Sequence, residues 1–282
     1  MSRFSGKICV VTGGGAGIGR ALCIALAERG ARGVIAADID VDGAQETARL
    51  ARAKGADAMA TLLDVSDPDA FAQTVDAVTS QFGVVHQLYN NAGVGQGGQT
   101  FLETEADYAK QVIDINLMGV LHGTRAFLPH LMASGDGHLV NISSINGIMA
   151  QGEGAIYALT KFGVRGFTEA VRVEMLLGDH PVRVVVVHPG GVRTQIASAA
   201  RSLGADLSPE MAARADRRER IYNEQLLTTP PEKAVAELLD GIERGRSRIV
   251  LTPKAKRLDW MVRLLPETYP KMVANWQRKT FQ

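Results

Sequence analysis

Short apolar runs recur along the chain and alternate with segments of helical spacing. Continuous apolar runs are typical of strands buried on both faces, and here they occupy residues 7–12, 34–37, 58–63, 84–90, 138–143, 182–187 and 248–251. Helical patterns lie between several of them, at residues 20–29, 43–54, 67–82 and 106–131. Such alternation favours a parallel sheet covered by helices on both faces. We therefore predict a single doubly wound α/β domain, over residues 1–252.

Residues 253–282 carry amphipathic helical spacing beyond the last predicted strand. Apolar residues at positions i, i+3, i+4 and i+7 are Leu258, Met261, Val262 and Leu265, and the spacing repeats after Pro266 in Tyr269, Met272, Val273 and Trp276. We predict two short helices that form a C-terminal extension.

This extension is basic, with seven lysines and arginines against Asp259 and Glu267, a net charge of +5. A basic amphipathic helix with tryptophan can lie on an anionic membrane surface. It can also cover the substrate site, join subunits or pack on the body of the protein. We favour packing on the protein itself and keep peripheral membrane contact as an alternative.

The composition excludes several classes of protein. The chain has 282 residues, 46% hydrophobic and 22% charged, which is ordinary for a globular protein. A net charge of +1 leaves no electrostatic footprint for a nucleic acid. No apolar run reaches the roughly 18 residues that a membrane span needs, and we expect neither a signal peptide nor a location outside the cytoplasm. Cys9 and Cys23 stand without a cluster of histidines or cysteines, so we expect no metal site and no disulfide.

A glycine-rich turn joins the first predicted strand to the first predicted helix. Glycines let the backbone turn tightly and approach a pyrophosphate, and the free N–H groups at a helix start attract anions. The spacing Gly-x-x-x-Gly-x-Gly differs from the commoner Gly-x-Gly-x-x-Gly, and a merely flexible loop is the alternative. We expect this turn to hold a dinucleotide through Thr12, Gly13, Gly15, Gly17, Ile18 and Gly19.

Asp38 ends the second apolar run, nineteen residues after Gly19. An acidic residue about 20 positions beyond the glycines accepts hydrogen bonds from the adenosine ribose and repels a 2′-phosphate. Ile39 follows it instead of a basic residue, and Ala16 precedes Gly17. The pattern therefore favours NAD over NADP, with a plain strand-end cap as the alternative role of Asp38.

Tyr157 and Lys161 are one helical turn apart, and Ser144 lies thirteen residues before the tyrosine. Residues at i and i+4 share a helix face. A neighbouring positive charge lowers the pKa of a phenol from its ordinary value of about 10. The pair therefore predicts an acid–base group that works near neutral pH.

Together these features resemble the short-chain dehydrogenase/reductase family, over about residues 7–251. The motifs are not specific singly but are highly specific jointly, and no catalytic position departs from the family's pattern. They are Thr12-Gly13-x-x-x-Gly17-Ile18-Gly19, Asp64-Val65, Asn90-Asn91-Ala92-Gly93, Asn116, Ser144, Tyr157-x-x-x-Lys161 and Pro189-Gly190-x-Val192-x-Thr194. The resemblance implies a Rossmann-type fold and hydride transfer to or from a nicotinamide cofactor.

Further cofactor contacts are implied by the resemblance alone. They are Asp64 and Val65 at the adenine, Asn91, Ala92 and Gly93 along the cofactor, and Pro189, Gly190, Val192 and Thr194 beside the nicotinamide. The alternative for the asparagine and proline motifs is that they are ordinary turns after strands.

The resemblance also implies the catalytic roles. Tyr157 would be the general base for alcohol oxidation and the acid for carbonyl reduction. Lys161 would lower the pKa of Tyr157 and hold the nicotinamide ribose, and Ser144 would hydrogen-bond the reacting oxygen. Asn116, a poor helix former within residues 106–131, would hold a water that links Lys161 to solvent.

Two stretches are expected to shape the substrate site. Residues 195–229 are rich in alanine and arginine. In the family this region is often a mobile lid, and a pair of surface helices is an equally good interpretation. Residues 145–156 link Ser144 to Tyr157. We expect substrate contacts from Gln96, Asn146, Gln151 and Glu153, with Gln99 and Met149 as further candidates and solvated loop residues as the alternative.

The leading hypothesis is an NAD-dependent oxidoreductase for a hydrophobic secondary alcohol or ketone, such as a steroid, a terpenoid or a lipid. One alternative is an NADP-dependent carbonyl reductase of the same family. Another is a dinucleotide-binding scaffold without turnover, against which the intact set of Asn116, Ser144, Tyr157 and Lys161 argues. The family's habit implies a homodimer or homotetramer, paired through the helices of Asn116 and Tyr157.

Overall fold

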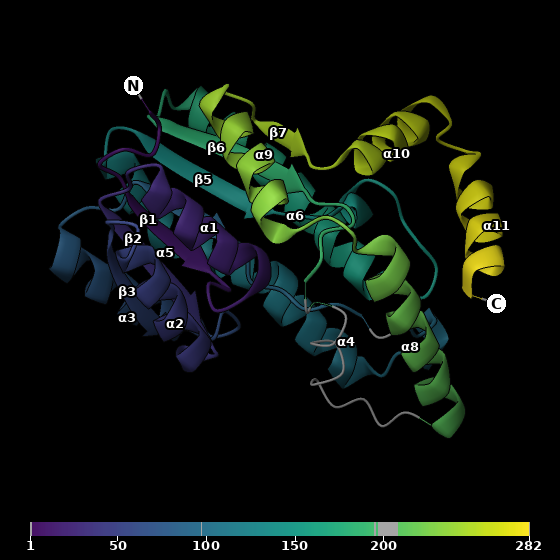
Figure 1. Cartoon of the computed structure of the whole chain (residues 1–282). Helices are drawn as coiled ribbons and strands as arrows, with labels where there is room; N and C mark the ends of the chain where they lie inside the picture. Colours follow the sequence, from purple (N-terminus) through teal and green to yellow (C-terminus); the bar gives the residue numbers. More distant parts are fainter. Residues whose placement is uncertain (1, 97, 195, 197–207, 282) are drawn as a thin grey trace.

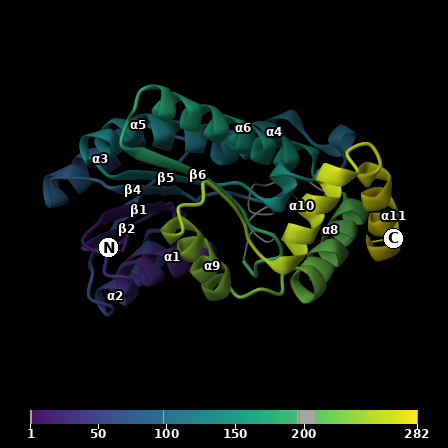
Figure 2. The same ribbon diagram turned by 90° about the horizontal axis from the view of Figure 1, so that it is seen from above.

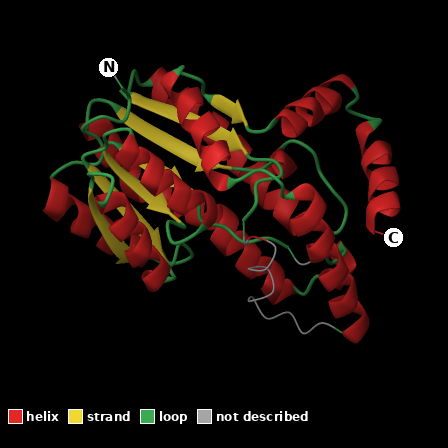
Figure 3. Ribbon diagram, viewed as in Figure 1, coloured by secondary structure: helices red, strands yellow, loops and turns green. Residues whose placement is uncertain are grey.

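A single parallel sheet forms the centre of the protein in this computed structural model, which describes residues 2–96, 98–194, 196 and 208–281 (Figure 1). Residues 195 and 197–207, the first part of the predicted lid, lie outside the described residues. The strands run in the order β3-β2-β1-β4-β5-β6-β7, and all neighbours are parallel, which confirms the predicted sheet (Figure 3). They are β1 (Ile8–Thr12), β2 (Gly33–Asp38), β3 (Asp57–Leu62), β4 (Gln87–Asn90), β5 (Gly137–Ile142), β6 (Val182–His188) and β7 (Arg248–Val250).

Helices cover both faces of this sheet (Figure 2). One face carries α1 (Gly17–Glu28), α2 (Val41–Arg52) and α9 (Pro231–Glu243), and the other carries α3 (Pro68–Phe82), α4 (Ala106–Ile113), α5 (Gly119–Ala133) and α6 (Ala155–Leu177). The order of strands reverses direction between β1 and β4, because the chain first builds outward to β3 and then returns. Ligands of such sheets bind beyond the carboxyl ends of the strands at this switch point.

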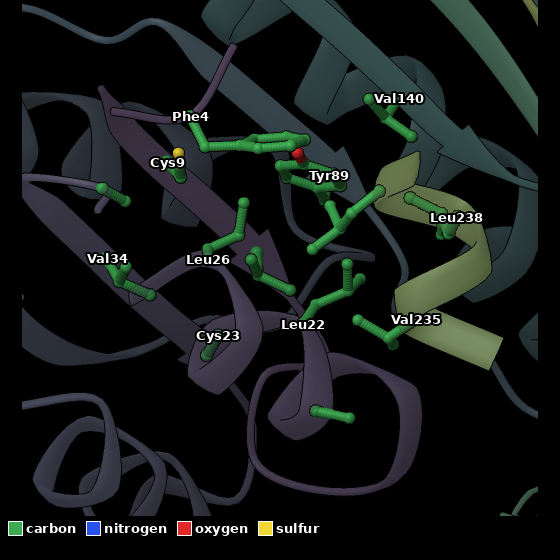
Figure 4. Packing of buried hydrophobic residues seen from close by; sticks show 14 of the residues in the cluster. Phe4, Cys9, Leu22, Cys23, Leu26, Val34, Tyr89, Val140, Val235 and Leu238 are labelled. Atoms are coloured by element: carbon green, nitrogen blue, oxygen red, sulfur yellow. The ribbon is translucent and has the colours of Figure 1, made fainter. Parts of the chain in front are cut away.

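The core between the sheet and the first helix layer is built from small and branched apolar side chains (Figure 4). Leu22 and Leu26 of α1 pack with Val235 and Leu238 of α9 in this cluster. Cys9 and Cys23 lie in the same cluster, fully buried and unpaired, and burial raises the pKa of both thiols. The cysteines are therefore inert apolar packing residues, as expected from the sequence.

The predicted helix at 106–131 is not one regular α-helix. Residues Asp114–Met118 form a π-helical turn (η2) between α4 and α5, and this turn carries the fully buried Asn116. The Asn116 amide nitrogen donates to the Val94 carbonyl, and its oxygen accepts from the Val94 N–H, both at 2.8 Å. The Asn116 side chain thus binds the backbone of the segment after β4. Such π turns are frequent at functional sites.

The C-terminal extension consists of α10 (Pro253–Leu264) and α11 (Tyr269–Phe281). The members of the predicted apolar stripe that lie on α10 are half-buried, and Ala255 and Asp259 are the buried residues of this helix. The Asp259 carboxylate accepts two hydrogen bonds from Arg248 of β7, at 2.8 and 2.9 Å. An ion pair of good geometry therefore joins α10 to the edge of the sheet.

Four further helical segments belong to the described residues. They are η1 (Phe101–Glu103), η3 (Ile145–Gly147), α8 (Pro209–Ile221) and the π turn η4 (Tyr222–Leu226). α8 and η4 occupy most of the described part of the predicted lid, and α11 lies beside α8. Within the described residues, no helix combines the length and the apolar character that crossing a membrane requires.

Two buried histidines make stability depend on pH. Burial lowers the pKa of His138 and of His188 to about 4, from an ordinary value of 6.5. Because both values are lower in the folded chain, the unfolded chain binds more protons between pH 6.5 and 4, and stability is lost as the pH falls. Each histidine accounts for up to about 3 kcal/mol, since one pKa unit corresponds to about 1.4 kcal/mol.

We therefore expect the free energy of unfolding, measured by chemical denaturation, to fall between pH 6.5 and 4. His138→Leu should reduce the slope of the free energy of unfolding against pH by the equivalent of about one bound proton. The matched change His180→Leu, at an exposed position, should leave the slope of the wild type. Equal slopes in the wild type and in His138→Leu would contradict the assignment.

Candidate active site

A cleft of about 680 Å³ opens at the carboxyl ends of the strands. It is lined by residues that end or directly follow six strands of the sheet, namely Gly13, Asp38, Leu63, Asn91, Ser143 and Pro189. This position and volume are typical of a cofactor and substrate site in a doubly wound fold.

Thr12 joins the two loops at the switch point. Its hydroxyl oxygen accepts from the N–H groups of Asn91 (3.0 Å) and Ala92 (3.1 Å). The Asn91 amide in turn donates to the carbonyls of Thr12 (3.0 Å) and Gly13 (3.3 Å). Thr12 is itself buried and does not line the cleft. Its role is therefore to hold the loop after β1 against the loop after β4.

The glycine turn is shaped by close backbone approach. Gly13 has a φ of +65°, and a Cβ atom there would lie 2.8 Å from the Ala92 Cα. A Cβ at Gly19 would lie 1.9 Å from the Gly13 carbonyl oxygen, so no side chain fits. Gly19 packs the turn onto α1 and does not line the cleft, whereas Gly13, Gly15, Gly17 and Ile18 do. The N-cap residue of α1, Ala16, offers no side-chain acceptor, so the first N–H groups stay available for an anion.

Asp38 lines the same end of the cleft. Its carboxylate accepts from the N–H groups of Gly15 (2.7 Å) and Asp40 (3.0 Å), which fixes its orientation toward the glycine turn. Ile39 beside it is exposed and lines the cleft. Among the described lining residues, the only basic side chains are Lys161 and Arg218. These contact Ile142 and Glu153, so neither is engaged with the strand end at Asp38.

Asp64 and Val65 after β3, and Asn91, Ala92 and Gly93 after β4, line the cleft. On the far side, the loop after β6 is tied down by Thr229, whose N–H donates to Gly191 at 2.9 Å. The Thr252 hydroxyl donates to the Gly190 carbonyl at 2.9 Å, and Gly190 itself does not line the cleft. Among the residues predicted beside the nicotinamide, the cleft is lined by Pro189, Val192 and Thr194.

Ser144, Tyr157 and Lys161 converge in the middle of the cleft. Ser144 is the second residue after the end of β5, and Tyr157 and Lys161 lie on the first two turns of α6. The hydroxyl of Ser144 hydrogen-bonds with Tyr157. The Lys161 ammonium lies over the Tyr157 ring, 5.7 Å from its centre, and donates to the Ile142 carbonyl at 3.3 Å. The fourth predicted catalytic residue, Asn116, is fully buried behind the cleft wall.

Burial dominates the electrostatics of Tyr157 and Lys161. Burial raises the pKa of Tyr157 to about 12, and the hydrogen bond with Ser144 opposes this shift. Burial lowers the pKa of Lys161 to about 8. Burial therefore favours the neutral form of both side chains.

The four predicted substrate residues all line the cleft, and three of their side chains already have a partner. The Gln96 side-chain oxygen accepts from the N–H of Tyr157 at 3.0 Å and so supports the start of α6. At Asn146 the backbone N–H donates to the Ser144 hydroxyl at 3.1 Å, whereas the side-chain oxygen is buried with no hydrogen-bond partner among the described residues. Gln151 accepts from the Tyr222 hydroxyl at 2.9 Å, and Glu153 pairs with Arg218. The further candidates Gln99 and Met149 are buried and do not line the cleft.

Sequence reasoning did not single out the side chains that close the outer end of the cleft. Arg218 and Tyr222 line it from α8 and η4, together with Ala215 and Leu227. The segment was expected near the substrate, and Arg218 and Tyr222 stand one helical turn apart, which is the only signal that the sequence offers.

Comparison with known proteins places these residues in context. The chain matches the short chain dehydrogenase family over residues 7–203. It is 42% identical over 281 residues to a putative oxidoreductase, SadH, of Mycobacterium tuberculosis, which covers 100% of this chain and 99% of the relative. It is 37% identical over 196 residues to a 3-alpha-(or 20-beta)-hydroxysteroid dehydrogenase of Mycobacterium bovis, covering 68% of this chain and 71% of the relative.

Among solved structures, a short chain dehydrogenase/reductase from Burkholderia phymatum in complex with NAD superposes with a TM-score of 0.87. It is 28% identical to this chain, and the match covers 95% of this chain and 97% of the neighbour.

Proposed function

The chain belongs to the short-chain dehydrogenase family, and from that premise we propose that it transfers a hydride between NAD and the carbon of a secondary alcohol or ketone. The observation that supports this most is the meeting of Ser144, Tyr157 and Lys161 with the glycine turn in one cleft. The nicotinamide would take up or deliver the hydride, whereas the protein would supply position and proton handling.

Tyr157 would exchange the proton of the reacting hydroxyl, as base in oxidation and as acid in reduction. Ser144, already hydrogen-bonded with Tyr157, would hold the same oxygen and steady the charge that builds on it. Because burial raises the pKa of Tyr157 to about 12, the phenol becomes a base near neutral pH only when positive charge gathers beside it. Lys161 would supply one such charge while binding the nicotinamide ribose, and Asn116 would hold the water that connects Lys161 to solvent.

We expect Tyr157→Phe to lower turnover by about 10²–10⁴-fold, the range of general acid–base catalysis. Binding of NADH, followed by nicotinamide fluorescence, should change less than about twofold, because the lost hydroxyl serves the proton and not the cofactor.

The matched change Tyr269→Phe, on α11 outside the cleft, should preserve turnover. Activity that survives Tyr157→Phe would show that another group is the base. A wild-type chain that binds NADH tightly and turns over no alcohol or ketone would instead favour the non-catalytic scaffold.

The cofactor proposal is NAD, with NADP as the alternative. A 2′-phosphate at Asp38 would meet a carboxylate whose orientation is fixed by Gly15 and Asp40. Among the described lining residues, no lysine or arginine is engaged at that strand end to neutralise such a phosphate. The negative charges of the phosphate and of the Asp38 carboxylate would repel each other, which disfavours binding of NADP.

We expect NADH to bind the wild type at least about tenfold more tightly than NADPH, because the phosphate would face an unpaired carboxylate. Asp38→Asn keeps an acceptor for the Gly15 N–H and removes the charge. It should therefore raise the affinity for NADPH and reduce the preference for NADH over NADPH. Asp57→Asn, an exposed carboxylate at the opposite end of the sheet, is the control. Tighter binding of NADPH by the wild type would favour the carbonyl reductase alternative.

The proposed substrate is hydrophobic. The outer cleft is lined by apolar and aromatic side chains, among them Val94, Ile145, Ala215, Tyr222 and Leu227. The similarity to a hydroxysteroid dehydrogenase is consistent with a steroid, terpenoid or lipid alcohol. Such a lining stabilises apolar groups by removing them from water.

We also propose that copies of this chain associate through α6. Its outward face carries a continuous apolar stripe at helical spacing, formed by Leu159, Phe162, Gly166, Ala170, Val173 and Leu177. Leu159 and Val173 are each 54% exposed, and Leu177 is 80% exposed. A contiguous exposed apolar stripe is typical of a surface covered by a partner.

We expect the wild type to be a dimer or tetramer by size-exclusion chromatography with light scattering. Val173→Glu should shift it toward the 30.2 kDa monomer, because a buried unpaired charge at an interface is costly. Leu62→Glu, at an exposed position of β3, is the matched control and should leave the mass unchanged. A monomeric wild type would refute the proposal. Contact of the C-terminal extension with a membrane surface is a separate hypothesis, which flotation with anionic liposomes tests on the chain with and without residues 253–282.

A further inference from the structure

The outer wall of the cleft is the part lined by residues 152–153 and by α8 and η4, and Arg218 is the one arginine among its described residues. The Arg218 side chain projects from α8, is only 10% exposed, and forms an ion pair with Glu153. Its second amino group lies 3.4 Å from the Gly152 carbonyl. Both Arg218 and Glu153 line the cleft. The positive charge at the outer wall is therefore neutralised within the wall itself.

The C-terminal helix holds this pair in place. The Arg218 guanidinium lies over two rings, 4.6 Å from the centre of Phe281 on α11 and 5.4 Å from that of Tyr222. These two rings stack at 5.6 Å with an angle of 15° between their planes. Trp276 meets Phe281 edge-on at 5.7 Å. Such stacked rings fix the position of a desolvated cation.

A second contact joins α11 to the same wall. The Gln277 amide accepts from the Gly152 N–H at 2.9 Å and donates to the Gly152 carbonyl at 3.2 Å, across 125 residues of sequence. The next residue, Glu153, has a φ of +54°, an uncommon conformation for a residue with a Cβ atom that persists only where surrounding contacts hold it. The helix therefore fixes the loop that presents Glu153 to Arg218.

We propose that the Glu153–Arg218 pair, held by Phe281 and Gln277 of α11, determines substrate specificity by neutralising the positive charge of Arg218 at the outer end of the cleft. The site then accepts uncharged alcohols and ketones and disfavours those with a carboxylate, because Arg218 has no free charge to offer one. α11 acts as a positioning element of the substrate site. This inference rests on the oxidoreductase function proposed above.

Removing the acid should create a new specificity. In Glu153→Gln the guanidinium remains fixed by the two rings but is no longer neutralised, so a carboxylate on the substrate can take the place of Glu153. The probes are matched pairs of one neutral alcohol and its carboxylate analogue, beginning with cyclohexanol and 4-hydroxycyclohexanecarboxylate. We expect the ratio of kcat/KM for the carboxylate over the neutral alcohol to rise at least about tenfold, mainly through KM.

The chain offers a matched control for this change. Glu103 of η1 also pairs with an arginine of α8, Arg214, but neither residue lines the cleft. Glu103→Gln should therefore leave the ratio unchanged. A ratio in Glu153→Gln that equals that of the wild type, or an equal rise in Glu103→Gln, would overturn the assignment of Glu153 and Arg218.

The role of α11 is tested by Phe281→Ala, with Met272→Ala on the exposed face of the same helix as its control. Phe281→Ala should raise KM for the neutral alcohol by about fivefold or more, with the affinity for NADH unchanged, because it loosens only the outer wall. It should also increase deuterium uptake in the loop at 150–154, as expected for a loop released from its contacts.

The hydrogen-exchange measurement separates failure of this inference from failure of the proposed function. Unchanged uptake and unchanged KM in Phe281→Ala would overturn the role of α11. Increased uptake in a protein that binds NADH but turns over none of the alcohols would support the positioning role of α11. The same result would refute the specificity proposal together with the oxidoreductase function.

Discussion

The hydrogen bonds between Thr12 and the loop after β4 are the contact on which the rest of the site depends. They join two strands that are neighbours in the sheet but are separated by more than 70 residues of chain. With these loops held together, only glycine fits at positions 13 and 19, because a Cβ atom at either position would clash with backbone atoms. The anion-attracting start of α1, the carboxylate of Asp38 and the backbone of Gly93 then face a common cleft. The fold thereby builds a dinucleotide site from backbone geometry before any catalytic side chain is considered.

Burial governs the chemistry of the catalytic cluster. Tyr157 and Lys161 are both driven toward their neutral forms by desolvation, in opposite directions on the pKa scale. In the proposed reaction, the Tyr157 phenol would keep its proton until positive charge gathers beside it. Asn116 adds a second constraint, because its π turn and its two bonds to Val94 tie the helix behind the site to the cofactor loop.

The substrate end of the cleft is assembled differently from the cofactor end. It consists of side-chain contacts between segments that are distant in sequence, the loop after Ser144, α8 and the terminal helix α11. Ion pairs, stacked rings and the Gln277 hydrogen bonds hold these segments, whereas the hydroxyl of Thr12 and the amide of Asn91 hold the loops after β1 and β4. Such contacts can change with little effect on the sheet, which is the property that a family needs to vary its substrates while keeping one reaction.

The sequence by itself determined the parallel sheet, the two helix layers, the glycine turn and the family, because these follow from local periodicity and from motifs whose spacing is set by backbone geometry. It also identified Ser144, Tyr157 and Lys161, which come together because the carboxyl end of β5 and the start of α6 lie at one edge of the sheet. Only the tertiary structure decided how strongly burial shifts the pKa of Tyr157 and of Lys161, since desolvation depends on every neighbouring residue. It also decided that Asp259 of α10 pairs with Arg248 of β7, and that Arg218 meets Glu153 and Phe281. These partners lie up to 65 residues apart in sequence and have no periodic relation to each other, so no local pattern could have paired them.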